Sequence, residues 1–310
     1  MLHARRHRLT LLVASLLVAL YLLLVQDKIA LPNRAAAALW DLAHLPLFFL
    51  LTVIFDHSVL KRHPRRAAVW LQLLLPPLVV FAIGTELLQS LTNREPSLGD
   101  VITDSVGIGL ATLWLASSRY VGAGWKKMLR GIVFAIAASL LIQPGVLLWA
   151  DYHIKHNFPM LSDFESIIDS SNWSLGKRSA EQARDGRHSL KIVFPTQLYS
   201  GTTLRHFPTD WSAYKTLHLS VFNPGNDTLP LSLRIHDRKH ELGEQPYHDR
   251  FNYNFAAGPG WTDVQLPINR IASGPRDRKL DLGQLAALRL FYQGLPADGT
   301  VVYLDAVYLD

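Results

Sequence analysis

The first half of the chain alternates long apolar runs with short basic segments, and this alternation limits what it can fold into. Five runs are nearly free of charge: Leu9–Val25, Ala35–Phe55, Ala67–Leu91, Val101–Ala116 and Met128–Ala150. Each is close to the roughly 20 residues that an α-helix needs to cross the hydrocarbon core of a bilayer. The pattern predicts a bundle of about five transmembrane helices within residues 1–150.

The first run allows two interpretations, because it follows Arg5, Arg6 and Arg8. A basic start before an apolar run is typical of a signal peptide. This run has no clear small-x-small cleavage site, and further apolar runs follow it. We therefore interpret it as the first membrane helix.

Charge is distributed unevenly between the two halves. Residues 1–150 hold 14 Lys and Arg against 7 Asp and Glu, whereas residues 151–310 hold 17 against 18. The excess positive charge lies in small clusters between apolar runs. Nucleic-acid binding instead needs basic residues gathered on one solvated face, so we expect a lipid bilayer and no nucleic acid as partner.

The basic residues also predict an orientation. With the N-terminus in the cytoplasm, the cytoplasmic segments hold 11 Lys and Arg and the opposite side holds 3. This asymmetry fits the positive-inside rule. We expect a multi-pass protein of the bacterial cytoplasmic membrane, with an odd number of spans and residues 151–310 on the outer side, periplasmic or extracellular. The chain contains no Cys, which excludes disulfides, thiolate catalysis and Cys-ligated metals.

From Asp151 onward no run is long enough to span a membrane, and the pattern changes to short alternating stretches. These stretches are Ser189–Phe194, Lys215–Phe222, Leu229–His236, Thr262–Ile268, Ala287–Tyr292 and Val301–Leu309. Turn-forming segments rich in Gly, Pro and Asn separate them. The pattern predicts a linker over residues 151–162 and an all-β jelly-roll sandwich over residues 163–310.

Several polar residues fall within the apolar runs or beside their ends. The candidates for a polar cluster that could carry out acid–base catalysis are His44, Glu86, Gln89, Arg94, Asp100 and Asp104. The predicted topology brings all of them to the outer end of the bundle, and ionisable groups inside a membrane are usually functional. The alternative is that they lie at water level beside helix ends, with Asp100 as a helix N-cap.

These residues carry a resemblance to a known family. The segments Asp41-Leu-Ala-His44, Gly84-Thr-Glu86-Leu-Leu-Gln89 and Arg94 to Gly107 make residues 8–120 similar to the VanZ-like membrane proteins. Asp104 departs from the Asn that is usual there. The resemblance implies a role in the cell envelope more than a particular reaction.

The second half is rich in Trp and Tyr, which can stack on sugar rings or fill a sandwich core. One polar, aromatic loop provides the ligand-binding candidates Tyr247, Asp249, Arg250, Asn252 and Tyr253. The alternative for the aromatic residues is core packing.

Residues 160–310 resemble a galactose-binding-like, carbohydrate-binding-module jelly roll. The resemblance rests on segments such as Asp163-Phe-Glu165, Trp211-Ser-Ala-Tyr214 and Tyr303-Leu-Asp305. It implies a structural calcium ion, for which Glu165 and Asp305 are the oxygen-ligand candidates. The alternative is that both are ordinary surface carboxylates.

These observations favour a membrane-anchored envelope protein that binds cell-surface polysaccharide or a lipid-linked glycan through its β domain. One alternative is an enzyme that acts on a lipid-linked envelope precursor at the polar cluster. Another is a membrane anchor carrying a protein-interaction module. We expect binding rather than catalysis, because no nucleophile motif, phosphate loop or two-carboxylate hydrolase signature is evident.

Overall fold

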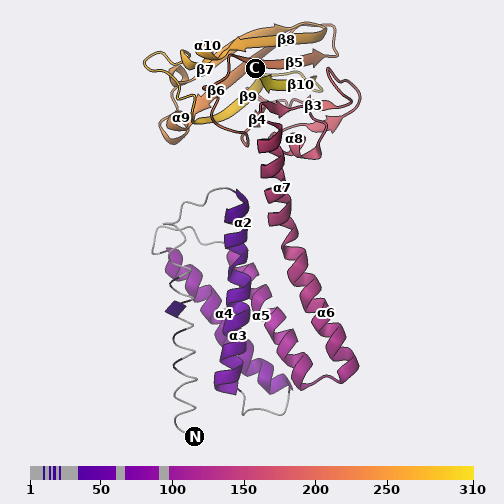
Figure 1. Ribbon diagram of the computed structural model, residues 1–310, viewed down its shortest axis with the longest axis vertical. Coiled ribbons are helices and arrows are strands. Elements are labelled where there is room, and N and C mark those ends of the chain that lie inside the picture. Colours follow the sequence, from indigo (N-terminus) through magenta and orange to yellow (C-terminus); the bar gives the residue numbers. More distant parts are fainter. Residues whose placement is uncertain are drawn as a thin grey trace. The chain divides into compact units, whose positions relative to one another are not determined.

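The computed structural model describes residues 34–60, 67–90 and 98–310, together with Thr10, Ala14, Leu17, Val18 and Tyr21 (Figure 1). The first predicted membrane helix and the basic loop at residues 61–66 thus lie almost entirely outside the described residues. The chain divides into two units, Met1–Leu148 and Trp149–Asp310.

The described part of the first unit is helical. Its helices are α2 (Arg34–Leu42), α3 (His44–Phe55), the π-helical turn η2 (Asp56–Leu60), α4 (Ala67–Ser90), α5 (Leu98–Arg119), α6 (Ala123–Leu140) and α7 (Ile142–Asn157). Among the described residues, four helical stretches are long and apolar enough to cross a membrane: Arg34–Leu60, Ala67–Leu88, Leu98–Arg119 and Ala123–Asn157. They coincide with the second to fifth predicted runs, so the helices predicted there are confirmed.

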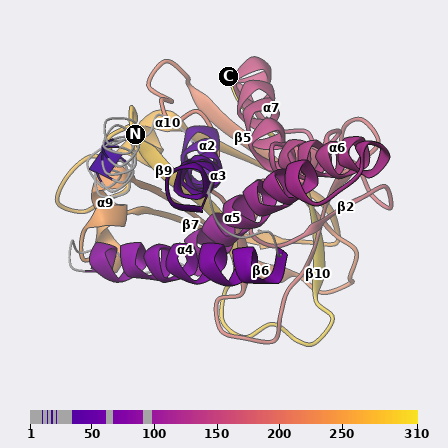
Figure 2. The same cartoon turned by 90° about the horizontal axis from the view of Figure 1, so that it is seen from below.

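Helix α5 is the centre of this unit and packs against α3, α4 and α6 (Figure 2). Phe48, Trp70, Leu74 and Ile108 are among the buried side chains between these helices. Gly107 permits the close approach of α5 to α3, because a Cβ atom at this position would lie 2.6 Å from the Leu45 carbonyl oxygen. This close helix contact therefore depends on a residue without a side chain.

The second unit consists of two antiparallel sheets. Their strands are β1 (Met160–Ser162), β2 (Lys177–Ser179), β3 (Ser189–Val193), β4 (Gly201–Leu204), β5 (Thr216–Asn223), β6 (Leu229–Asp237), β7 (Phe251–Ala257), β8 (Gly260–Pro267), β9 (Leu285–Tyr292) and β10 (Val301–Leu309). The first sheet has the order β2-β3-β10-β5-β8, with β1 also paired to β10, and the second has the order β4-β9-β6-β7. The predicted all-β sandwich is confirmed.

Side-chain alternation gives the sandwich its core. In β6, Leu231, Leu233 and Ile235 point inward and are fully buried, whereas the residues between them lie on the opposite face. The large buried cluster to which they belong draws only on residues of the second unit. A unit of about 160 residues with its own core is large enough to fold alone.

The start of this unit differs from the predicted linker. Helix α7 continues to Asn157, and Met160–Ser162 form β1, which pairs with β10. Ring contacts one helical turn apart support the additional turns: Trp149 contacts His153, and Tyr152 stacks on His156. The apolar run ends at Ala150, but the helix does not.

Candidate functional site

The outward face of the sheet β4-β9-β6-β7 carries a row of polar side chains. Strand register places Arg289 of β9 opposite Arg234 of β6, and Arg234 opposite Asn252 of β7. These positions alternate with the buried core positions, so all three side chains lie on the face away from the core. Because neighbouring strands lie about 4.8 Å apart, the row extends roughly 10 Å across the sheet.

Arg250 extends this row beside β7. Its Nε donates a hydrogen bond to Asn252 Oδ1 at 3.2 Å. Arg205, just after β4, lies near enough for its charge to act on Arg289. We call the outward face formed by Arg234, Arg250, Arg289 and Asn252 the arginine face.

The arginines of this face repel one another. Among the described residues, Arg234, Arg250 and Arg289 form no salt bridge. Burial, together with the charges of Arg250 and Arg289, lowers the pKa of Arg234 to about 10. Burial and the charge of Arg205 likewise lower the pKa of Arg289. The guanidinium groups stay protonated at neutral pH, so the face keeps a concentrated positive charge.

Two exposed tyrosines flank the arginine face. Tyr199 is 59% exposed, its carbonyl oxygen accepts a 2.9 Å hydrogen bond from Arg289, and its ring contacts Phe291. Tyr247 is 65% exposed, and the Arg250 guanidinium lies 5.0 Å from its ring centre. Exposed aromatic rings beside donors and acceptors can stack on a sugar and bind its hydroxyl groups.

The predicted ligand-binding loop is only partly assembled on this face. Tyr247, Arg250 and Asn252 come together, and the Asn252 side chain donates to the Tyr247 carbonyl oxygen. Asp249 is instead an ion-pair partner of Arg278. Tyr253 lies opposite Leu233 and packs against the core. Ligand binding by these residues remains a prediction.

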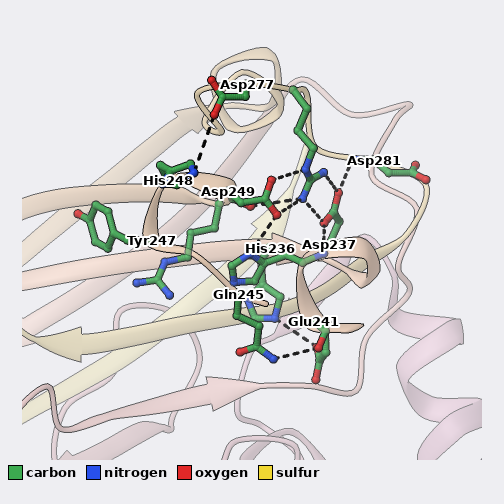
Figure 3. A network of polar contacts seen from close by, with 12 residues as sticks. His236, Asp237, Glu241, Gln245, Tyr247, His248, Asp249, Asp277 and Asp281 are labelled. Atoms are coloured by element: carbon green, nitrogen blue, oxygen red, sulfur yellow. Dashed lines mark hydrogen bonds and ion pairs between the residues drawn. The ribbon is translucent and has the colours of Figure 1, made fainter. Parts of the chain in front are cut away.

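A network around Arg278 holds the loop that carries Tyr247 (Figure 3). Arg278 donates to both oxygens of the fully buried Asp237, at 2.5 and 2.8 Å, and also to both oxygens of Asp249. Asp237 caps helix α9 (Arg238–Leu242) and also accepts the backbone N–H of Asp281 at 2.9 Å. Arg278 therefore joins the end of β6 to the 3-10 turn η3 (Tyr247–Asp249).

Two histidines lie against this network. His236 contacts Glu241 at 3.2 Å, and His240 contacts Asp249 at 3.3 Å. Burial, with a smaller contribution from the Arg234 charge, lowers the pKa of His236 to about 4. Burial also lowers the pKa of His240. Both rings are therefore neutral at pH 7 and add no positive charge to the arginine face.

The two predicted calcium ligands, Glu165 and Asp305, both accept backbone hydrogen bonds from the loop at residues 184–188, and calcium binding by them remains a prediction. Glu165 Oε1 accepts the backbone N–H groups of Arg187 and His188 at 2.6 and 2.8 Å. These hydrogen bonds, that of Arg187 above all, lower the pKa of Glu165 to about 2. Asp305 is fully buried and accepts backbone N–H groups at both oxygens. The described part of the chain holds no group of three or more His, Cys, Asp or Glu residues arranged to hold a metal ion.

The helical unit assembles part of the predicted polar cluster. His44 Nδ1 lies 3.0 Å from Asp104 Oδ1, and both side chains are buried. Glu86 and Asp100 are also buried, and their charges act on Asp104. Asp41, three residues before His44, is exposed.

The remaining two residues of the predicted cluster are not described in full. The Gln89 side chain and Arg94 lie outside the described residues. Catalysis by any member of the cluster remains a prediction.

A second buried ion pair lies elsewhere in the helical unit and was not predicted. Asp56 is fully buried, accepts a 2.7 Å hydrogen bond from Trp70 Nε1, and pairs with Arg119 at 2.5 Å. The Arg119 guanidinium also lies 5.3 Å from the centre of the Trp70 ring. The sequence signal was a lone carboxylate at the end of an apolar run and a lone arginine at the end of another.

Comparisons with known proteins concern the β unit. No protein-family model and no curated protein matches the chain, so the VanZ-like resemblance of the helical unit remains a prediction. The β unit is similar to a family 11 carbohydrate-binding module from Clostridium thermocellum, solved with a β-1,3-1,4-mixed-linked tetrasaccharide, at 17% identity and a TM-score of 0.38. That match covers 48% of this chain and 93% of the module.

Two further solved structures resemble the same unit. One is a family 22 xylan-binding domain from Paenibacillus barcinonensis, with 18% identity, coverage of 44% of this chain and 84% of that chain, and a TM-score of 0.32. The other is an exo-β-agarase, with 19% identity, coverage of 49% and 24%, and a TM-score of 0.38.

Proposed function

We propose that this chain is a membrane-anchored cell-envelope protein whose β unit binds a glycan on the arginine face. The observation that carries the proposal is the pair of exposed tyrosines, Tyr199 and Tyr247, on either side of a row of hydrogen-bonding side chains. Sugars have apolar ring faces and polar edges, and this arrangement offers a partner for each. The surrounding strands hold these groups in place before a ligand arrives, which reduces the ordering cost of binding.

The proposal of a membrane anchor rests on the surface of the helical unit. Large apolar side chains on its helices are exposed, including Leu50, Val80 and Phe134. Such a surface is unfavourable in water and favourable in lipid. The Lys and Arg distribution supports a cytoplasmic N-terminus and a β unit on the outer side of a bacterial cytoplasmic membrane.

Glycan binding can be tested with purified residues 149–310 on an array of bacterial and plant polysaccharides. We expect specific binding, and we expect Tyr199→Ala and Tyr247→Ala to weaken it several-fold each by removing a stacking surface. Tyr152→Ala is the matched control, because Tyr152 is 64% exposed in the same unit but lies on α7. A folded unit that binds no polysaccharide, or variants indistinguishable from Tyr152→Ala, would contradict the proposal. Capture of a protein instead would favour the interaction-module alternative.

Topology can be tested separately in the full chain. A phosphatase reporter fused after Asp310 should be active only if that residue lies outside the cytoplasm. Robust activity of a cytoplasmic reporter at the same position would contradict the orientation, whatever the β unit binds.

A second candidate function is catalysis on a lipid-linked envelope precursor, favoured by the buried His44–Asp104 pair beside two further carboxylates. A buried histidine paired with a carboxylate can accept and return a proton. In the full chain, Glu86→Gln should abolish an envelope phenotype at normal protein abundance, whereas Asp41→Asn, at an exposed position, should not. Normal phenotype and normal abundance for Glu86→Gln would exclude the cluster from function.

A further inference from the structure

The arginine face carries positive charge that the described parts of the chain do not neutralise. Arg234, Arg250 and Arg289 are each partly buried, and none forms a salt bridge with another described residue. The charge of Glu241 acts on Arg234 only weakly, and Glu241 is itself hydrogen-bonded to His236. Like charges held close together and partly shielded from water repel one another, which costs free energy unless a bound anion neutralises them.

The guanidinium groups are held in position and keep unused hydrogen-bonding capacity. Arg289 donates to the Tyr199 carbonyl oxygen, yet its buried Nε has no acceptor among the described residues. Arg250 is held by Asn252, and Arg234 makes one long contact, 3.3 Å, with His236. Each group therefore keeps N–H donors for a ligand, and arginine presents such donors in the planar pairs that suit carboxylates and sulfates.

The row also has the form that an extended chain requires. The arginines come from β9, from β6 and from the residue just before β7, so they follow one another across the sheet. The two exposed tyrosines lie toward opposite edges of this row. A phosphate headgroup needs a compact cradle, whereas an acidic polysaccharide repeats its charge along a chain whose rings can stack on the tyrosines.

We infer that the arginine face selects acidic glycans, that is, polysaccharides whose sugars bear carboxylate or sulfate groups. This inference rests on the proposed glycan binding and makes it more specific. Arg234 at the centre of the row would bind the acidic group, with Arg250 and Arg289 on either side. The tyrosines would provide the sugar contact that neutral and acidic chains share.

The test compares two polysaccharides with the same backbone. Residues 149–310 would be titrated with polygalacturonate and with fully methyl-esterified polygalacturonate at low and high salt, with dextran sulfate and dextran as a second pair. We expect at least a tenfold preference for the acidic member of each pair, decreasing as salt rises. Arg234→Gln and the less central Arg250→Gln should reduce this preference at least fivefold. Arg270→Gln is the control, because Arg270 stacks on the core-facing Tyr253.

The outcomes separate the inference from the function on which it rests. Equal binding of acidic and esterified chains, unaffected by the arginine variants, would overturn the inference and leave glycan binding intact. Binding of no polysaccharide by the folded unit would overturn both. Binding of phosphatidylglycerol vesicles but of neither polysaccharide, with loss in Arg234→Gln, would assign the face to lipid headgroups instead.

Discussion

Removing Arg278 should destabilise the β unit more than any other single loss of a surface-loop charge. Its guanidinium is the counter-charge of Asp237, which is fully buried, and it also pairs with Asp249. In Arg278→Ala the Asp237 carboxylate would stay buried without that partner. Breaking a buried ion pair in this way typically costs about 3–5 kcal/mol.

The pKa of Asp237 provides an independent measure of how much these interactions stabilise the folded unit. Burial by itself would raise this pKa, but hydrogen bonds from Arg278 and from the backbone of Asp281 and His240 lower it from 3.8 to about 2. At 1.36 kcal/mol for each pKa unit, that fall corresponds to roughly 2 kcal/mol of folding free energy. This contribution is present above the unfolded pKa of about 4 and is lost as pH falls through 2. We therefore expect Arg278→Ala to lower the free energy of unfolding by about 3 kcal/mol at pH 7.

The assay is urea denaturation of residues 149–310, followed by far-ultraviolet circular dichroism. The difference between wild type and Arg278→Ala should shrink as pH falls from 7 to 3, because protonation of Asp237 removes the unpaired charge in the variant. Asp237→Asn should restore part of the stability of Arg278→Ala for the same reason. Arg276→Ala is the matched control, since Arg276 is exposed in the same loop and should leave the unfolding curve unchanged. A loss at pH 7 no larger than that of the control, or one that does not change with pH, would refute the reasoning.

Two further predictions concern the helical unit in detergent or lipid. Gly107→Ala should lower its thermal stability, because the added methyl group would meet the Leu45 carbonyl oxygen at 2.6 Å, whereas Gly109→Ala, with open space around it, should not; equal melting temperatures would contradict the close packing of α3 and α5. Arg119→Ala should lower the free energy of unfolding of the helical unit by about 3 kcal/mol, because it leaves Asp56 buried without its counter-charge. The yield of folded protein should fall as a result. Asp56→Asn in the same chain should recover part of that yield, and no recovery would mean that Arg119 acts through something other than this pair.

Local patterns were sufficient for the elements of this protein but not for their pairing. The helices coincide with apolar runs, and strands such as β6 coincide with alternating stretches, because both follow from side-chain periodicity along the chain. Strand β10 lies between β3 and β5, a placement set by packing between residues far apart in sequence. The periodicity of side chains along a strand does not indicate which strands become its neighbours.

Some contacts in the candidate sites could be predicted from the sequence, whereas others depend on strand pairing or on residues far apart in the chain. The meeting of His44 with Asp104 follows from topology, since each lies at the same end of an apolar run. Arg234 and Arg289 each interrupt an apolar strand, and only the register of β9 on β6 brings them side by side. Asp56 could not be recognised as half of an ion pair, because its partner Arg119 is 63 residues away.

The central position of β10 also affects how the β unit is made. Strand β3 ends at Val193 and its neighbour β10 begins at Val301, so 108 positions separate them along the chain. At the usual rate of 5–20 residues per second, about 5–20 s of synthesis pass between the two strands. During that interval β3 and β5 lack the strand that joins them, and unpaired strand edges invite pairing with other chains. The unit is therefore most prone to aggregation before β10 has been synthesised, and a chaperone that binds the exposed strand edges would act in that interval.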